Sequence, residues 1–455
     1  MLRAGAVQVD LTPAGRLRGR HNLFSIVEPE KPIYARVVAL ELNGQIVLAI
    51  ACDVMGVTSA AADRLENAVA NAAGVAPVDT IFWPTHTHSC PCMNPATESV
   101  VQEHGLGISN QQWLDTLEQR LCVAARRAID QLEPVTVAGG VGPVKGIAAN
   151  RIIEFPDGTV GMRSATTADC PAGNIDPNVR SLFLLRADGN PMAILCNYAV
   201  HPTSLGGGET SHINPDFPGY AADVIRQRLG DEVSCLFGMG AAGDINCRKY
   251  APRSGTRSVR DTRRLGEIFA GEVVRQFQSI DRAVTVNEMN VSTHRYTCEM
   301  DRELTAPLEE LNDSLLCAVD VYRRTLTQGK AHDIATAQRA LVEAQWQHSY
   351  GHALDESGAV PVVIRRLTLD DEVCILFAAG EYFVEIGKAV FDRSPFAHTM
   401  FVTAANITPL YVPDQSAFDR LAGRGDAYGV DRMRLITRHG CINLAQRLVK
   451  LAESG

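Results

Sequence analysis

The stretch 34-YARVVALELNGQIVLAIACD-53 contains the clearest fold signal in this chain. Two apolar runs, Tyr34–Leu42 and Gln45–Asp53, flank the dipeptide Asn43-Gly44. Asn-Gly between two runs rich in aliphatic and β-branched residues is a strong signal for a two-residue hairpin turn. The stretch therefore predicts two antiparallel strands, the second of which ends at the carboxylate of Asp53.

The residues after this hairpin predict a helix and then another strand. SAAADRLENAVANAAG (59–74) has helical spacing, with Ser59 as a candidate N-cap and Gly74 after the last turn. TIFWPTHTH (80–88) is an apolar run that leads into a polar loop. Strands joined by both a tight turn and a helix indicate an α/β fold with mixed sheets and flanking helices.

Two more hairpins are predicted, turning at Asp188-Gly189 and at Asp370-Asp371. The region Leu304–Tyr350 differs, because it is long, polar and rich in helix formers, and it predicts an inserted helical hairpin. No internal repeat or linker is evident in the sequence. We therefore expect a single domain over residues 1–455, with a helical insertion at 304–350 and an active site in loops at strand ends.

The composition narrows the classes of function. The net charge of −9 gives no basic footprint for nucleic acid or anionic lipid. The N-terminal MLRAGAVQVDLTPAG has no basic region followed by an apolar run, so no secretory signal is recognised. No apolar run approaches the length of a membrane span. We expect a cytoplasmic protein with reduced thiols, no nucleic-acid partner and no stable membrane association.

The loop THTHSCPC (85–92) is the first segment that indicates chemistry. Residues two apart on an extended chain point to the same side, so His86 and His88 can face one point. Imidazole binds zinc readily, and Cys90 and Cys92 could add thiolates to form a closed structural site. The alternative is a loop whose histidines are hydrogen-bonded and whose thiols bind no metal.

Other loops also follow apolar strands and carry polar residues. His201 precedes Pro202 in NYAVHPTS, and Glu381 lies after a glycine in AAGEYFVEIG. The glycines of GMGAAGDINC permit a ligand to approach the backbone closely, although the P-loop pattern is missing. Each feature alone also fits a structural role, such as a packed histidine or a helix-capping carboxylate.

Taken in order, these segments resemble the motifs of the neutral/alkaline ceramidase family. THTHSCP is similar to the family's T-H-T-H-S-G-P motif, and AANRI is similar to an N-R-S segment. The motifs that follow are matched, in the same order, by NYAVHPTS, NPDFPGYA, GAAGDIN, AAGEYFVEIG and NITPLYVPD. The resemblance runs from Gly5 to Gly429, and the order of so many short motifs argues against chance.

The resemblance implies an α/β catalytic domain that holds one zinc ion and hydrolyses an amide bond. It implies four zinc ligands: His86, His201, Glu381 and Tyr411. His88 would lie beside the metal and the substrate without being a main ligand. Arg151, at the arginine of the N-R-S segment, would contact the substrate.

Some positions depart from the family's pattern. Asn246 replaces the serine of the family's G-D-[VI]-S-P-N loop; an amide is not a nucleophile, but it can donate a hydrogen bond to an oxyanion. Cys90 replaces the glycine of S-G-P, and Cys92 follows it at the expected pocket entrance. The chain also ends near the point where the family's catalytic domain ends. These departures weaken ceramide as the substrate more than they weaken zinc-dependent hydrolysis.

Our hypothesis is a hydrolase that cleaves an N-acyl or cyclic amide of a small, soluble, anionic substrate with zinc-activated water. His88 would move the proton, and Asn246 would stabilise the oxyanion. Arg151 would bind a substrate carboxylate through two hydrogen bonds. Asp53 would orient a zinc-binding histidine. Cys92 would contact the substrate together with Arg151 and Asn246.

Three alternatives stay open on the sequence alone. The same zinc site could hydrolyse a lactone or an ester, or the chain could be a zinc-containing binding protein without catalysis. A structural zinc site built on Cys90 and Cys92 is the third.

The insertion at 304–350 would cover the pocket or contact another subunit of a homo-oligomer.

Overall fold

The computed structural model describes residues 1–15, 17–18, 26–57, 59–91, 93, 102–105, 109–162, 171–205, 212–247, 258–304, 306–405, 410–421 and 435–454. Within these ranges the chain is mixed α/β, with sheets flanked by helices, which confirms the predicted fold class. No helix in them is both long enough and apolar enough to cross a membrane.

Within the described ranges, three sheets share one strand order. The first contains β1 (Arg3–Asp10), β4 (Tyr34–Leu42), β5 (Gln45–Cys52) and β6 (Thr80–Pro84), with β7 (Glu133–Pro134) beside β1. The second contains β8 (Thr136–Pro143), β12 (Asn178–Leu185), β13 (Pro191–Tyr198) and β15 (Ser234–Met239). The third contains β17 (Met289–Glu299), β18 (Ala359–Leu369), β19 (Val373–Ala378) and β21 (His398–Val402). In each sheet one edge strand runs parallel to its neighbour, namely β6, β15 and β21, and the other pairs are antiparallel.

The helices follow the same scheme in every sheet. A helix connects the two parallel strands: α1 (Ser59–Ala73), α4 (Asp216–Leu229) and α8 (Val384–Arg393). A second helix follows the parallel strand: α3 (Gln111–Asp130), α5 (Val259–Gln278) and α10 (Arg438–Glu453). We call the three sheet-and-helix sets unit 1 (3–130), unit 2 (136–278) and unit 3 (289–453).

The chain is thus a threefold structural repeat, which the sequence did not reveal. The repeat lies in topology, which short-range sequence patterns describe poorly, because the units differ in loop length and in side chains. The three hairpins were each predicted, and the first turn has the left-handed backbone that Asn-Gly favours, with φ of 53° at Asn43 and 88° at Gly44.

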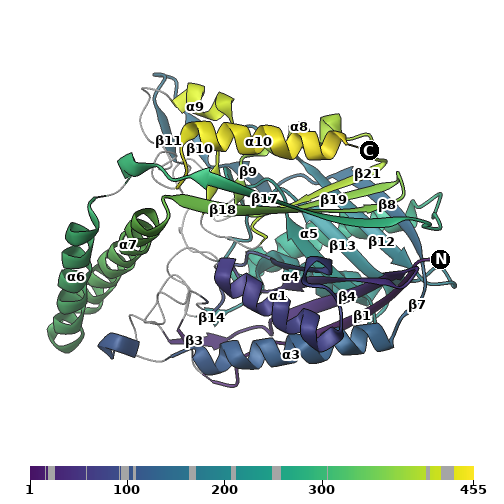
Figure 1. Ribbon diagram of the computed structural model, residues 1–455, viewed down its shortest axis with the longest axis horizontal. Coiled ribbons are helices and arrows are strands. Elements are labelled where there is room, and N and C mark those ends of the chain that lie inside the picture. The colour runs from purple at the N-terminus through teal and green to yellow at the C-terminus, as the bar shows by residue number, and fades with distance from the viewer. Residues whose placement is uncertain are drawn as a thin grey trace.

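The three sheets meet in one apolar core and are backed by helices on their outer faces. Alternate residues of a strand point to opposite faces, so Leu195 lies in the shared core while Ile194 packs toward α4 and α5. Figure 1 shows α8 and α10 along the top of the third sheet, and α1 and α3 on the opposite side of the molecule. Both faces of each sheet are therefore covered, which explains why β13 is buried along its whole length.

Each unit carries an excursion between its first two strands. Unit 1 inserts β2 (Leu17–Arg18) and β3 (Ile26–Pro29), and unit 2 inserts β9 (Ala148–Asn150), β10 (Ile152–Glu154) and β11 (Val160–Met162). The unit 3 excursion holds η3 (Arg302–Leu304), α6 (Leu308–Gln328) and α7 (Ala331–Glu356). The remaining short elements are η1 (Pro77–Asp79), β14 (His212–Ile213), β16 (Ile245–Cys247), β20 (Glu381–Tyr382), β22 (Tyr411–Val412) and α9 (Gln415–Leu421).

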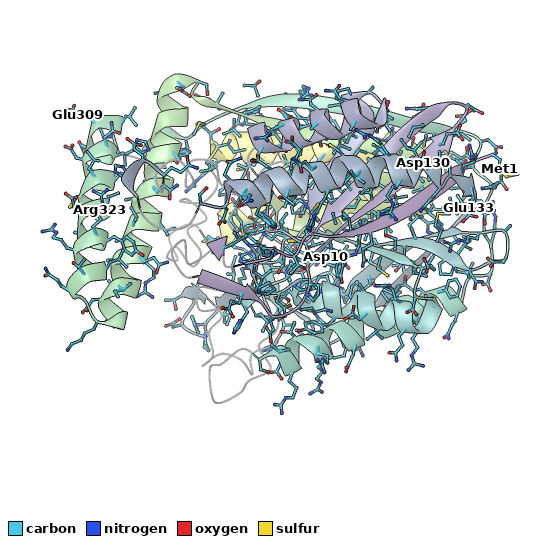
Figure 2. The ribbon with its side chains drawn as sticks, turned by 90° about the horizontal axis from the view of Figure 1, so that it is seen from below. Met1, Asp10, Asp130, Glu133, Glu309 and Arg323 are labelled. Carbon is cyan, nitrogen blue, oxygen red and sulfur yellow. The ribbon has the colours of Figure 1, made fainter. Side chains whose placement is uncertain are left out.

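The helical hairpin predicted near 304–350 is confirmed, although its second helix continues to Glu356. Figures 1 and 2 both show it projecting from the body at the end away from Met1, and Glu309 and Arg323 lie on its outer helix α6. The two helices bury a small apolar cluster of their own that includes Val319 and Leu341. This local cluster lets the hairpin extend beyond the shared core.

A buried ion pair connects unit 1 to unit 3. Glu66 of α1 accepts two hydrogen bonds from the guanidinium of Arg365 on β18, at 2.5 and 2.6 Å, and both residues are buried. We predict that Glu66→Ala lowers the free energy of unfolding by about 3–5 kcal/mol, because it leaves a buried guanidinium without its counter-ion. Urea denaturation followed by circular dichroism would measure the loss. The double variant Glu66→Leu/Arg365→Met should lose less, and an equal or larger loss would contradict this account.

Candidate metal centre and active site

The parallel strands place the motif loops at one end of each sheet. Two parallel neighbours end on the same side, so each unit sends two loops to that side, where sites of α/β proteins form. The strands β5, β13 and β19 are the third in chain order of their sheets, and three residues after their ends lie Met55, His201 and Glu381. The loops also match in hydrogen bonding, since Val54 N donates to Cys52 O at 2.8 Å and Val200 N to Tyr198 O at 2.9 Å.

Three histidines from two of these loops gather in one place. His86 and His88 follow β6 in unit 1, and His201 follows β13 in unit 2. Each offers a ring nitrogen, and these nitrogens lie within 4.8 Å of one another. His86 and His201 are fully buried, whereas His88 is partly exposed. The cluster could hold a metal ion.

Backbone carbonyls fix the orientation of the two buried rings. His86 Nδ1 lies 2.6 Å from Met55 O, and His201 Nδ1 lies 2.7 Å from Ala242 O and 3.1 Å from Ile245 O. A carbonyl oxygen only accepts, so each Nδ1 must carry the proton. Each neutral ring then presents the lone pair of its Nε2, which is the usual arrangement around metal-binding histidines.

Those lone pairs point toward a carboxylate. Glu381 Oε2 lies 2.8 Å from His201 Nε2, and Oε1 lies 3.7 Å from His86 Nε2. Three electron-rich groups facing one buried space repel one another unless a cation lies between them. Two imidazole nitrogens and a carboxylate oxygen are ligands that zinc favours, so this donor set fits a zinc ion.

The local electrostatics favour the protonation states that bind a metal. Burial lowers the pKa of His201, and the nearby charge of Arg151 lowers it further, so the imidazole stays neutral. Burial by itself would raise the pKa of Glu381, but the imidazoles of His86 and His201 in their protonated form, together with Arg151, hold it well below its ordinary value in the metal-free site. An ionised carboxylate beside neutral imidazole is the metal-binding state.

The backbone at His86 is strained. Its φ is 67°, in the left-handed region that residues with a Cβ rarely adopt. The same feature appears at Ala404 of unit 3, with φ of 58°, and both amides donate to equivalent carbonyls, His86 N to Val54 O and Ala404 N to Gly380 O. The shared loop geometry turns the chain here, and in unit 1 it brings a histidine ring into the cluster.

Tyr411 and Arg151 lie beside Glu381. Tyr411 in β22 is the direct parallel partner of Glu381 in β20, so their Cα atoms are neighbours. The buried guanidinium of Arg151 donates through Nη1 to the Tyr411 hydroxyl at 3.1 Å. The structure therefore brings together the imidazoles, the carboxylate, the phenol and the guanidinium that the sequence indicated.

Asn246 also lies next to the centre. It forms a parallel β-bridge with His201, and its Oδ1 accepts a hydrogen bond from Thr203 Oγ1 at 3.0 Å. Its side chain is partly exposed. Of the two cysteines in the first motif, Cys90 is buried, and Cys92 lies outside the described residues.

Asp53 does not orient a histidine. Its carboxylate accepts from Arg36 Nη1 and from the Tyr34 amide, both at 2.9 Å, in the strands behind the loop. The expected orienting role belongs instead to the carbonyls of Met55 and Ala242. Carbonyl contacts carry no signature in the amino-acid sequence, so no residue pattern could have revealed them.

Comparisons with solved structures identify the fold. The chain superimposes on the crystal structure of neutral ceramidase from Pseudomonas aeruginosa with a TM-score of 0.70 at 18% sequence identity, covering 99% of this chain and 74% of that one. This chain has the neutral ceramidase fold. A second solved structure, a ceramidase complexed with C2, gives a TM-score of 0.70 at 16% identity and covers 99% of this chain and 75% of that one. No model of a known protein family and no curated sequence matches the chain.

The cluster of His86, His201 and Glu381 should bind one metal ion per chain. We predict that a metal-free sample takes up one equivalent of zinc, as measured by elemental analysis. At a hundredfold excess over the dissociation constant, zinc should stabilise the fold by about 2.7 kcal/mol. His86→Ala and His201→Ala should each lose most of the bound zinc, because each removes an Nε2 donor. Cys90→Ser is the matched control and should retain it; loss of zinc in that variant would point to a thiolate site.

Proposed function

We propose that this protein is a zinc-dependent hydrolase that cleaves an amide bond in a small, soluble, anionic substrate. The observation that carries the proposal is the convergence of the His86 and His201 imidazoles, each oriented by a backbone carbonyl, on the carboxylate of Glu381 in a buried site. The fold shared with solved ceramidases supports amide hydrolysis as the class of reaction.

His86, His201 and Glu381 would hold the metal, with Tyr411 as a fourth ligand. When bound, zinc supplies a Lewis acid that polarises a carbonyl and lowers the pKa of water to about 7. Arg151 Nη1 donates to the Tyr411 hydroxyl at 3.1 Å, and this hydrogen bond holds the phenol beside Glu381.

His88 would be the group that moves the proton. It is the least buried of the three histidines, and its ring centroid lies 5.1 Å from that of His86. A partly exposed imidazole beside the centre can accept the proton that the attacking water loses and return it to the leaving nitrogen. In this assignment His88 is not one of the main metal ligands. Its ring nitrogen nevertheless lies within 4.8 Å of those of His86 and His201, which is close enough for it to bind the metal as well.

Asn246 would donate a hydrogen bond to the tetrahedral oxyanion. Thr203 Oγ1 is bonded to the carbonyl oxygen of the Asn246 side chain, which leaves the NH₂ group on the other side of the amide. A fixed donor costs no reorganisation during the reaction, which makes such donors effective.

We predict that Asn246→Ala lowers the turnover number about 10²-fold while zinc content stays the same, since one oxyanion donor is lost. Amine release from N-acyl substrates, followed with an amine-reactive fluorophore, would measure it. Asn246→Asp is a matched control of the same shape that cannot donate, and it should be equally slow. Wild-type turnover in either variant would remove Asn246 from the mechanism.

The buried guanidinium of Arg151 favours an anionic substrate, because it lies beside the proposed zinc ligands and attracts a negatively charged group. We predict that N-acyl amino acids are cleaved about 10-fold or more faster than the corresponding N-acyl amino amides, because a guanidinium binds a carboxylate with charge-assisted hydrogen bonds. Arg151→Met should abolish this preference; an unchanged preference would show that another group selects the anion.

The same groups would also serve an ester or a lactone, since the attack on the carbonyl and the oxyanion are alike. An ester series assayed beside the amide series would rank the two reactions. Absence of both activities in a zinc-loaded sample would favour the alternative of a zinc-containing binding protein.

A further inference from the structure

Asp244 has no assigned role, yet it is one of the most completely enclosed acids near the centre. It lies in the loop between β15 and β16 of unit 2 and is 1% exposed. Burial raises the pKa of Asp244 to about 6, although hydrogen bonds from Val384 N and from the Asn150 side chain lower it. The carboxylate is therefore ionised at neutral pH, and its oxygens act as strong acceptors.

The contacts of Asp244 reach two other segments of the site. Its Oδ1 accepts from Val384 N at 2.9 Å, and its Oδ2 accepts from Asn150 Nδ2 at 2.7 Å. Its backbone oxygen accepts from Arg151 N at 2.7 Å. Val384 begins α8, directly after the short strand that contains Glu381. Asn150 ends β9 and precedes Arg151.

The loop that carries Asp244 also orients the ring of His201. The carbonyls of Ala242 and Ile245, on either side of Gly243-Asp244, contact His201 Nδ1. Gly243 N donates to Tyr382 O at 2.7 Å, and a Cβ added at Gly243 would lie 2.5 Å from Glu381 O. The loop is thus packed directly against the strand of Glu381, with no space for a side chain at Gly243.

We propose that Asp244 is the positioning residue that holds three segments in register, those of His201, Glu381 and Arg151. The three segments come from different parts of the chain. The Asp244 carboxylate accepts hydrogen bonds from the Glu381 segment, at Val384, and from the Arg151 segment, at Asn150. The backbone carbonyls of its own loop orient His201. Without the Asp244 carboxylate, the Val384 amide loses its buried acceptor, and Asn150 Nδ2 loses one acceptor and keeps its hydrogen bond to Asn174 O. Of the measurements below, zinc affinity and the cobalt spectrum rest on the proposed function, and hydrogen exchange does not.

The test uses two variants that change the same contacts in different ways. Asp244→Asn keeps the shape but removes the charge and places an NH₂ group against one of the two donors. Val384→Pro removes the N–H that donates to Asp244 and keeps an apolar side chain at this buried position. Proline is tolerated at the first position of a helix, and Phe383 before it is extended, with φ of −73° and ψ of 154°, as a residue preceding proline requires.

The control is Asp176→Asn. Asp176 is also a buried acid, and its hydrogen bonds stay within its own segment, to Asn178 and Arg180. Zinc affinity is measured by competition with a colorimetric chelator, and the geometry of the centre by the visible spectrum of the cobalt-substituted protein. We expect Asp244→Asn to weaken zinc binding about 10–100-fold and to change the cobalt spectrum, with a smaller effect in the same direction for Val384→Pro. Asp176→Asn should match wild type.

Hydrogen exchange in the metal-free protein gives an independent readout. The amides of Arg151 and Val384 should exchange faster together in Asp244→Asn, although they are far apart in sequence. Folded variants with wild-type zinc affinity and unchanged exchange would overturn the proposal, and so would an equal loss in Asp176→Asn. If Asp244→Asn does not fold, Val384→Pro decides. If wild type binds no zinc, the proposed function fails and the exchange experiment still decides the role of Asp244.

Discussion

Trp83 connects all three units, and the position of the site depends on this connection. Its ring is fully buried, lies 5.0 Å from the ring of Phe377 in unit 3, and donates through Nε1 to Phe237 O in unit 2 at 2.9 Å. His86 follows three residues later. Because the parallel strands of each unit end on the same side of this shared core, the loops that carry His86, His201 and Glu381 must meet there.

The metal centre makes unequal use of the three equivalent loops. The position three residues after the third strand is Met55 in unit 1, His201 in unit 2 and Glu381 in unit 3. His201 and Glu381 direct their side chains into the centre. Met55 contributes its backbone carbonyl, which orients His86. A near-symmetric scaffold thus supports an asymmetric set of proposed ligands, in which Arg151 already stabilises the buried charge of Glu381.

The sequence predicted the secondary-structure elements that depend on short-range patterns and the residues that belong to recognisable motifs. The Asn-Gly hairpin, the helix at 59–73 and the helical insertion are short-range patterns, and all were predicted correctly. The threefold repeat was missed because it exists in the order of strands, and Asp53 was misplaced because nothing local shows that Arg36 is its partner. The carbonyls of Met55 and Ala242 illustrate the general limit, since a backbone contact between distant segments leaves no trace in residue types.

The central claim is that His86, His201 and Glu381 hold a metal ion, and it can be tested most directly by anomalous X-ray diffraction at the zinc edge from crystals of the zinc-loaded protein. The account predicts one strong peak at about 2.0–2.2 Å from Nε2 of His86, Nε2 of His201 and a carboxylate oxygen of Glu381. A peak bound instead by the sulfur of Cys90, or the absence of any peak beside the two imidazoles, would contradict it.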